Sequence, residues 1–178
     1  METVSVPAVV VNPDSATLVD LVERHLANDA DIPLFSKPDG NNGWVDVSAR
    51  DFAADAKLIA RGLIHRGVKP GDRVALMSAT RYEWSLIDFA VAYAGGISVP
   101  IYETSSPSQI AWILKDSGSN IVIVENDRHA QGVKRAKDSE SLSNVSETLV
   151  IDGDGLDQLR ADGEKVSEAV SYTHLRAH

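Results

Sequence analysis

The 178-residue chain contains no cysteine, which excludes disulfide bonds and thiolate metal sites and favours a cytoplasmic location. Its longest apolar runs fall far short of a membrane span. The segment from Met1 to Val11 has no basic residue ahead of its apolar part, so we expect no secretory signal peptide there. The sequence leaves peripheral membrane contact open, because such contact requires neither a membrane-spanning segment nor a signal peptide.

Clusters of basic residues are also missing. The chain has 17 lysine and arginine residues against 26 aspartate and glutamate residues, which gives a net charge of −9. Binding to nucleic acid depends on neutralising phosphates with cations, so we expect no nucleic-acid partner. The length is that of about one domain, and 43% hydrophobic with 24% charged residues is an ordinary globular composition.

Several catalytic sequence motifs are absent as well. There is no G-x-x-x-x-G-K-[ST] phosphate loop, no G-x-G-x-x-G fingerprint after a strand, and no G-x-S-x-G nucleophile elbow. The five histidines are scattered and suggest no metal cluster. We therefore predict no catalytic residue and no metal ligand in this chain.

The amino-terminal part is predicted to form an arm, a helix and a β-hairpin. Residues 1–16 contain two prolines and no periodic pattern, which indicates an extended arm. A helix follows over about 17–28, and five of its side chains share one face: Leu18, Leu21, Val22, His25 and Leu26. On that face we expect His25 to be a packed core residue rather than a ligand. Short strands at 32–36 and 44–47 flank a dense turn signal.

From residue 48 onward the pattern is that of an α/β protein. A long helix over about 49–66, with Ser48 at its start, precedes four strands that alternate with three helices. The predicted strands are 73–78, 97–101, 120–125 and 149–151, and the predicted helices between them are 82–94, 107–117 and 127–137. This order predicts βαβ units in a parallel sheet, preceded by the helix and the hairpin. The acidic segment after residue 151 is loosely patterned, with at most a short helix around 156–160.

The helix predicted over 82–94 is apolar around most of its circumference. Such a helix must be covered on more than one side. We read this as a hint that the chain is part of something larger, and we expect exposed apolar surface on this helix and poor solubility of the chain.

The best candidate site is the polar turn within Val99 to Ser108. Ser106 fits the N-cap of the following helix, Pro107 its first position and Gln109 its third, which together predict a capping box. The turn should open at the carboxyl edge of the parallel sheet, where α/β folds place ligands. The hydroxyl groups of Thr104 and Ser105 are therefore candidates for the wall of a binding site, with helix capping as the alternative role.

One further group of carboxylates, Glu125 with Asp127, follows the predicted strand at 120–125. On an exposed turn we expect these side chains to be solvated.

The last eight residues, 171–178, break the local pattern and hold two of the five histidines. They resemble a translated sequencing adapter, so we expect a non-native tail. A natural disordered tail is the alternative, and metal binding by the histidine pair requires that the tail be helical.

Five short motifs carry a family resemblance. They are G-V-K-P-G-D-R-V-A-L at 67–76, T-R-Y-E-W at 80–84, A-G-G at 94–96, V-P-I-Y-E-T-S-S at 99–106 and I-L-K-D-S-G at 113–118. In this order and spacing they resemble the amino-terminal part of adenylate-forming (AMP-binding) enzymes, in particular bacterial long-chain fatty acid–CoA ligases of the actinobacterial type. The resemblance covers about residues 17–170.

The resemblance implies a reaction in which a fatty acid and ATP give an acyl-adenylate and diphosphate, and coenzyme A then displaces AMP with the help of Mg²⁺. The family binds the phosphates with a Ser/Thr/Gly-rich loop ending in Pro-Lys-Gly and uses a lysine from a separate carboxyl-terminal domain. Neither element is in this sequence, so the resemblance transfers no catalytic residue to any position. It implies an incomplete fragment of a larger adenylation domain, inactive alone, whose partner is the remainder of its own chain.

Two other functions stay open at this point. One is a different adenylate-forming enzyme, such as an aryl-CoA ligase or a peptide synthetase adenylation domain. The other is a free-standing α/β binding module. Acyl chain length, oligomeric state and membrane association are not specified by these residues.

Overall fold

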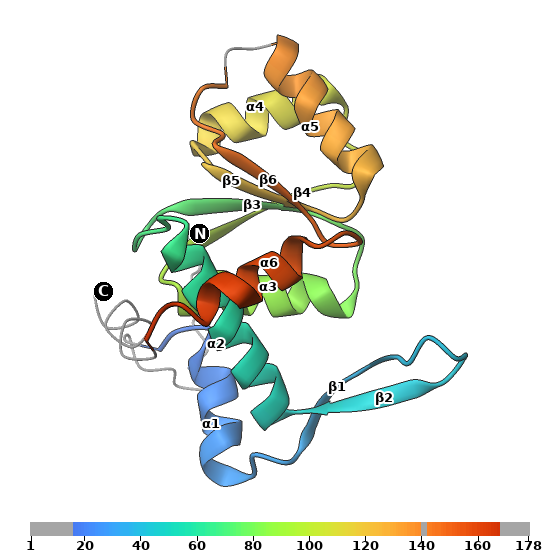
Figure 1. The fold of residues 1–178 in the computed structure, drawn as a ribbon, viewed down its shortest axis with the longest axis vertical. Coiled ribbons are helices and arrows are strands. Elements are labelled where there is room, and N and C mark those ends of the chain that lie inside the picture. The colour runs from blue at the N-terminus through green and yellow to red at the C-terminus, as the bar shows by residue number, and fades with distance from the viewer. Residues whose placement is uncertain (1–15, 140–141, 168–178) are drawn as a thin grey trace, which may run out of the picture.

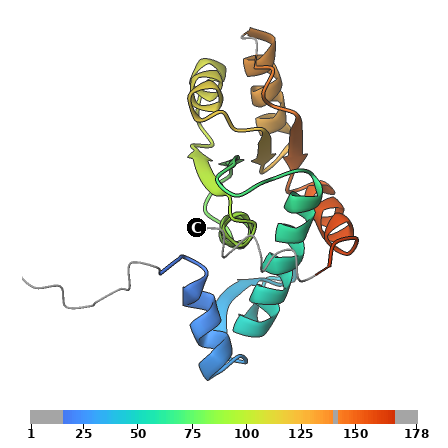
Figure 2. The same cartoon turned by 90° about the vertical axis from the view of Figure 1, so that its left-hand side faces the viewer.

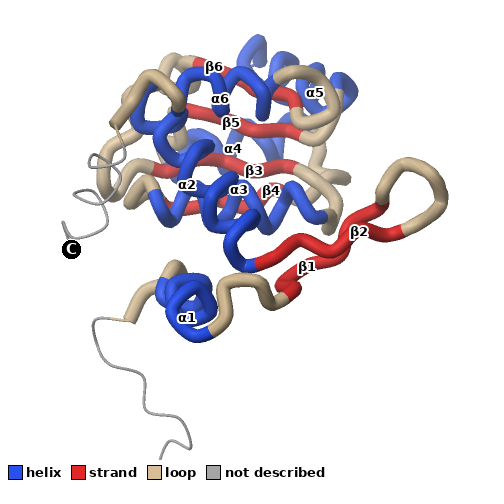
Figure 3. Tube along the Cα trace, turned by 60° about the horizontal axis from the view of Figure 1, so that its bottom comes forward, coloured by secondary structure: helices blue, strands red, loops and turns tan. Residues whose placement is uncertain are grey.

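A four-stranded parallel sheet with helices on both faces forms the body of the protein. A computed structural model describes residues 16–139 and 142–167. The sheet has the order β4-β3-β5-β6, and Figure 3 shows its four strands side by side. The strands are β3 (Arg73–Met77), β4 (Ile97–Ile101), β5 (Ile121–Val124) and β6 (Glu147–Val150).

In the described part of the chain, six helices surround the sheet and its amino-terminal extension. They are α1 (Asp20–Asn28), α2 (Ala49–His65), α3 (Tyr82–Tyr93), α4 (Pro107–Ser117), α5 (Asp127–Ser139) and α6 (Gly155–Gly163). Helices α4 and α5 lie on one face of the sheet, and α2, α3 and α6 lie on the other (Figure 1). The predicted α/β class with its parallel sheet is confirmed. The predicted arm, up to residue 15, and the predicted tail at 171–178 lie outside the described residues.

The apolar runs form the two central strands. Every residue of β5 and all but the first residue of β3 are buried, because helices cover both faces of a parallel sheet. Strand β4 is an edge strand, and Pro100 lies in it at a position where the missing N–H costs no ladder hydrogen bond. The predicted positions of these two central strands are confirmed.

The predicted hairpin consists of β1 (Pro33–Pro38) and β2 (Trp44–Ser48). It projects from the body in Figure 1 and, with α1, lies at the opposite end of the molecule from α4 and α5 in Figure 2. At its turn, the Asp39 carboxylate accepts the backbone N–H groups of Asn41 and Gly43 at 2.7 and 2.9 Å, which lowers the pKa of Asp39. The Phe35 ring stacks on Phe52 of α2 with 4.7 Å between centroids and anchors the base of the hairpin.

Helix α1 is rotated relative to its predicted face. Val19 and Val22 are buried, whereas Leu18 and Leu21 are 41% and 46% exposed. His25 is exposed, so its prediction as a packed core residue is wrong.

The cause is a polar contact made by Glu23 in the same helix. The Tyr93 hydroxyl donates to the Glu23 carboxylate at 2.8 Å, and the Lys57 ammonium lies 2.8 Å from it. Burial, followed by this hydrogen bond, raises the pKa of Tyr93. Because the Glu23 side chain points inward, the predicted apolar face of α1 points partly outward.

Helix α3 is covered by the chain itself. None of its side chains is exposed, and its aromatic residues pack against α2 and β1. Phe52 lies edge-on to Phe89 at 5.3 Å and to Tyr82 at 6.2 Å. Burial, with the negative charges of Asp55 and Glu83, raises the pKa of Tyr82 to about 12. The expectation of exposed apolar surface on this helix is therefore wrong.

The two carboxyl-terminal helices pack against the rest of the protein. One face of α5 buries His129, Gly132, Val133 and Ala136. Helix α6 is longer than the predicted 156–160 and packs along α2.

Two glycines make the close approach of α2 and α6 possible. A Cβ atom at Gly62 would lie 2.0 Å from the Leu159 carbonyl oxygen, and one at Gly163 would lie 2.1 Å from the Leu58 carbonyl oxygen. Charged pairs flank this contact: the Arg160 guanidinium donates to both Asp55 oxygens at 2.8 and 2.9 Å. The sequence signal was weak because glycines and charged residues form much of the contact, beside the two buried leucines Leu156 and Leu159.

We predict that Gly62→Ala forces α2 and α6 apart and destabilises the fold by about 2 kcal/mol or more, since overpacking a tight contact costs roughly 1–3 kcal/mol. Urea unfolding followed by circular dichroism measures this. Gly153→Ala is the matched control, because its added methyl would meet no atom closer than 3.6 Å. Equal midpoints for the two variants would contradict the close-contact interpretation.

Candidate functional site

A hollow of about 530 Å³ opens at the carboxyl edge of the sheet, between the end of β3 and the end of β4. Its wall comes from the β3–α3 loop, the first turn of α3 and the turn after β4. The lining residues are Ser78, Ala79, Thr80, Trp84, Pro100, Ile101, Tyr102, Glu103 and Thr104. The sequence placed the polar turn at this edge, and the structure confirms that position.

The turn leads into α4 through the predicted capping box. The Ser106 hydroxyl accepts the Gln109 N–H at 3.3 Å, and the Gln109 side-chain oxygen accepts the Ser106 N–H at 2.8 Å. Pro107 holds the first helical position. The helix ends at Gly118 in the left-handed conformation. Ser106 is therefore used in capping the helix.

The structure separates the two hydroxyl candidates. Thr104 lies in the wall of the hollow together with Ser78 and Thr80. Ser105 is not among the lining residues, and its backbone N–H donates to the Tyr102 carbonyl at 2.9 Å, which closes the turn. Thr104 thus remains a candidate for the wall of a binding site, and Ser105 shapes the turn.

Sequence reasoning missed the role of Glu125. Its carboxylate accepts the Ala79 N–H at 2.7 Å and the Ser78 hydroxyl at 3.2 Å, so it connects the end of β5 to the loop that lines the hollow. The expectation of a solvated side chain is wrong for Glu125, while Asp127 is exposed. The sequence signal for this role was the position of Glu125 at the end of a buried strand, because the carboxyl ends of neighbouring parallel strands meet at one edge of the sheet.

The charge of the hollow's lining is low. Among the described residues that line it, Glu103 is the one charged residue and none is a cation. The nearby Arg81 is engaged elsewhere, with its guanidinium 2.6 Å from the Glu83 carboxylate and 2.6 Å from the Asp152 carboxylate. Within 16–139 and 142–167, no group of three histidine or acidic residues is arranged to hold a metal ion. These residues therefore do not fit a nucleotide triphosphate with its Mg²⁺.

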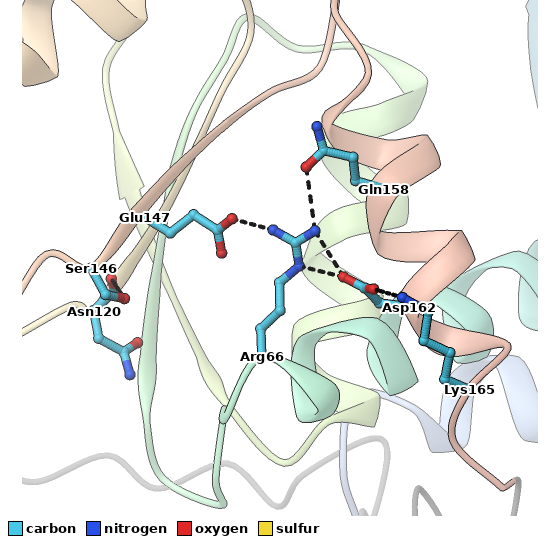
Figure 4. Close-up of polar contacts among 7 residues, drawn as sticks. All are labelled: Arg66, Asn120, Ser146, Glu147, Gln158, Asp162 and Lys165. Atoms are coloured by element: carbon cyan, nitrogen blue, oxygen red, sulfur yellow. Dashed lines mark hydrogen bonds and ion pairs between the residues drawn. The ribbon is translucent and has the colours of Figure 1, made fainter.

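The densest ion-pair cluster surrounds Arg66, on the amino side of the sheet (Figure 4). The Arg66 guanidinium contacts Glu147 at the start of β6, Asp162 of α6 at 2.8 Å and the Gln158 side chain at 3.3 Å. The Lys165 ammonium lies 2.7 Å from Asp162. These contacts connect the end of α2 with β6 and α6, so the cluster stabilises the fold.

No helix in the described part of the chain is long and apolar enough to cross a membrane.

The comparisons with known proteins agree with this architecture. The model of the AMP-binding enzyme family matches residues 22–176. The long-chain-fatty-acid–CoA ligase FadD15 of Mycobacterium bovis is 39% identical over 99% of this chain and 30% of its own length. The long-chain-fatty-acid–CoA ligase of Escherichia coli O6:H1 is 34% identical over 91% of this chain and 28% of its own length.

Solved structures show the same fold. The structure of the long-chain-fatty-acid–CoA ligase FadD1 from Archaeoglobus fulgidus has a TM-score of 0.74, with 16% identity, over 89% of this chain and 32% of that one. The architecture is thus that of an α/β segment of adenylation domains. The chain belongs to the AMP-binding enzyme family. It spans about 30% of the length of the curated ligases that it matches.

We predict that Glu125→Ala loosens the wall of the hollow. The Ala79 N–H loses its acceptor, and an unpaired donor in a partly buried place costs about 1 kcal/mol. Faster amide hydrogen exchange over residues 78–80 is the expected result. Asp127→Ala removes an exposed carboxylate two residues away and should leave exchange in this loop unchanged; unchanged exchange in both variants would rule out the connecting role of Glu125.

The Arg66 cluster predicts a pH-dependent effect of Asp162→Asn. The hydrogen bond from Lys165, with Arg66, holds the pKa of Asp162 below its ordinary value of 3.8. A carboxyl group whose pKa is lowered in the folded state stabilises the fold at pH values above its ordinary pKa. This stability is lost as the pH falls through the folded-state pKa.

The Asp162→Asn variant should therefore be less stable than the parent at pH 7, with the difference shrinking below pH 3.8. Thermal unfolding at a series of pH values measures this. Asp157→Asn is the control, since that side chain is 80% exposed and pairs with Arg160 alone among the described contacts. A difference that stays constant with pH would contradict the assignment.

Proposed function

We propose that this chain is the amino-terminal part of an AMP-forming long-chain fatty acid–CoA ligase. The observation that carries the proposal is the 39% identity to FadD15 over 99% of the chain. Residues 17–170 would be the first portion of the adenylation domain, and residues 171–178 a non-native tail. The whole enzyme would act in the cytoplasm, with peripheral membrane contact left open.

The substrates that follow are a long-chain fatty acid, ATP and coenzyme A. Bound Mg²⁺ offsets the negative charge of the phosphates during such a reaction. The described residues form no site that fits this group, so we assign them no catalytic step. Their role is to supply a rigid sheet and a wall at its carboxyl edge, in which Thr104 and the turn at 102–106 lie.

The absence of a cationic lining in the hollow supports inactivity of the chain by itself. Adenylation needs donors or cations aimed at the phosphate charge that develops in the transition state. We therefore expect the 178-residue chain to show no palmitate-dependent ATP–pyrophosphate exchange above background.

A chimera tests the proposal. Residues 1–170 of this chain replace the aligned segment of Mycobacterium bovis FadD15, and the chimera and the 178-residue chain are assayed for palmitate-dependent ATP–pyrophosphate exchange. We expect exchange from the chimera and none from the chain alone. Intact FadD15 is the positive control.

Two results would contradict the proposal. Turnover by the isolated chain would show that it is a complete enzyme. A chimera that unfolds cooperatively, and is therefore folded, but shows no exchange would show that this chain does not substitute for the ligase segment.

A further inference from the structure

The turn between β1 and β2 holds a dipeptide with a chemistry of its own. Asn42 is the one asparagine in the sequence that is followed by glycine. The turn lies at the tip of the hairpin, which projects from the body of the protein (Figure 1). Asn41 and Asn42 are exposed, and a Cβ atom added at Gly40 would meet nothing within 4 Å. Solvent therefore reaches this turn freely.

An asparagine followed by glycine can lose its side-chain amide group without an enzyme. The glycine backbone nitrogen attacks the side-chain carbonyl carbon of the asparagine, and the new C–N bond closes a succinimide ring. The amide NH2 group leaves as ammonia, together with the proton that the backbone nitrogen gives up. Water then opens the ring at either carbonyl and leaves aspartate or isoaspartate. Glycine favours the attack because no Cβ atom crowds its nitrogen.

Hydrogen bonds from one residue hold this dipeptide in the turn. The Asp39 backbone N–H donates to the Gly43 carbonyl at 3.0 Å. The Asp39 Oδ1 atom accepts the Asn41 N–H at 2.7 Å and the Gly43 N–H at 2.9 Å. Between them, Asn42 has a φ of 62°, in the left-handed region that asparagine tolerates better than most residues. The nitrogen that would attack is thus bonded through its hydrogen to a carboxylate.

The Asp39 carboxylate opposes the attack in two ways. The Gly43 nitrogen must give up its proton to become a nucleophile, and a neighbouring negative charge disfavours that loss. The hydrogen bond also keeps the nitrogen in the turn, so the turn must open before the nitrogen reaches the Asn42 side chain. The N–H groups of Asn41 and Gly43 lower the pKa of Asp39, which makes this carboxylate a poor base for the proton.

We propose that Asn42 is a site of spontaneous deamidation and that the Asp39 carboxylate slows the reaction. The product has a carboxylate at residue 42, in the same turn as Asp39, and its isoaspartate form has an extra methylene in the backbone. Both changes loosen the tip of the hairpin. The base is held separately, by the stacking of Phe35 on Phe52, so the body stays folded. The inference does not depend on the proposed function.

Peptide mapping by mass spectrometry tests the proposal. The 178-residue chain is kept in mildly alkaline buffer, and the mass gain from replacing an amide by a carboxylate is followed at each asparagine. We expect this gain at Asn42 and not at Asn41, which is exposed in the same turn but is followed by asparagine. Isoaspartate should accompany aspartate at residue 42, because opening of the ring gives both.

The Asp39→Ala variant tests the restraint. It should raise the rate of deamidation at Asn42 at least about fivefold, because it removes two hydrogen bonds to a charged group. Asp46→Ala is the matched control. Asp46 is an exposed carboxylate of the same hairpin, and it accepts the Ser36 hydroxyl at 2.6 Å rather than the Gly43 N–H. We expect Asp46→Ala to deamidate at the parent rate, and both variants to keep the parent melting temperature.

The Asn42→Asp variant represents one product of the reaction. Amide hydrogen exchange over residues 38–44 should be faster in this variant than in the parent, with an unchanged melting temperature. A fall in melting temperature would show that the effect reaches the body of the protein and would contradict a change confined to the tip.

The remaining outcomes decide between the two parts of the proposal. If neither the parent nor Asp39→Ala gains mass at Asn42, the site is wrong. If Asn41 and Asn42 gain mass equally, exposure alone governs the reaction, and the assignment to the dipeptide is wrong. If Asp39→Ala is no faster than the parent, or Asp46→Ala is as fast as Asp39→Ala, the restraint by Asp39 is wrong.

Discussion

The contact between α2 and α6 holds the two ends of the described chain together. The contact is possible because Gly62 and Gly163 have no side chain. The backbone of the opposing helix leaves no room for a larger residue at either position. Around it, Arg160 binds both oxygens of Asp55, and the Arg61 guanidinium donates to the Gly163 carbonyl at 3.1 Å. Since α2 also packs against α1, α3 and the hairpin, the amino-terminal elements are joined to the sheet through both α6 and α3.

At the carboxyl ends of the strands, carboxylate side chains hold the connecting loops in place. Glu125 binds the β3–α3 loop, and Arg81 bridges Glu83 and Asp152, so three connections at the carboxyl edge are linked by charged hydrogen bonds. These bonds fix the β3–α3 loop, which forms one wall of the hollow. Among the described residues that line the hollow, Glu103 carries the one formal charge.

Much of the fold was predictable, because its signals are local. The apolar run at 74–77 and the alternation after it indicated buried parallel strands, and the capping box at Ser106 was readable from three residues. Predictions failed where a distant residue decided the outcome. The rotation of α1 depends on a bond between Tyr93 and Glu23, and the extent of α6 depends on partners in α2 about a hundred residues earlier. For the candidate site, the place of the turn and the capping by Ser106 followed from sequence, whereas the role of Glu125 did not.

By itself, then, the sequence determined the α/β class, the order of strands and helices and the membership in a family, because periodicity, caps and short motifs act over a few residues. Tertiary structure alone decided which faces are buried, that α3 is covered and the β4 edge is not, and that Thr104 lines the hollow while Ser105 does not. These outcomes depend on contacts between segments far apart in the chain, and such contacts form only once the backbone has brought the segments together.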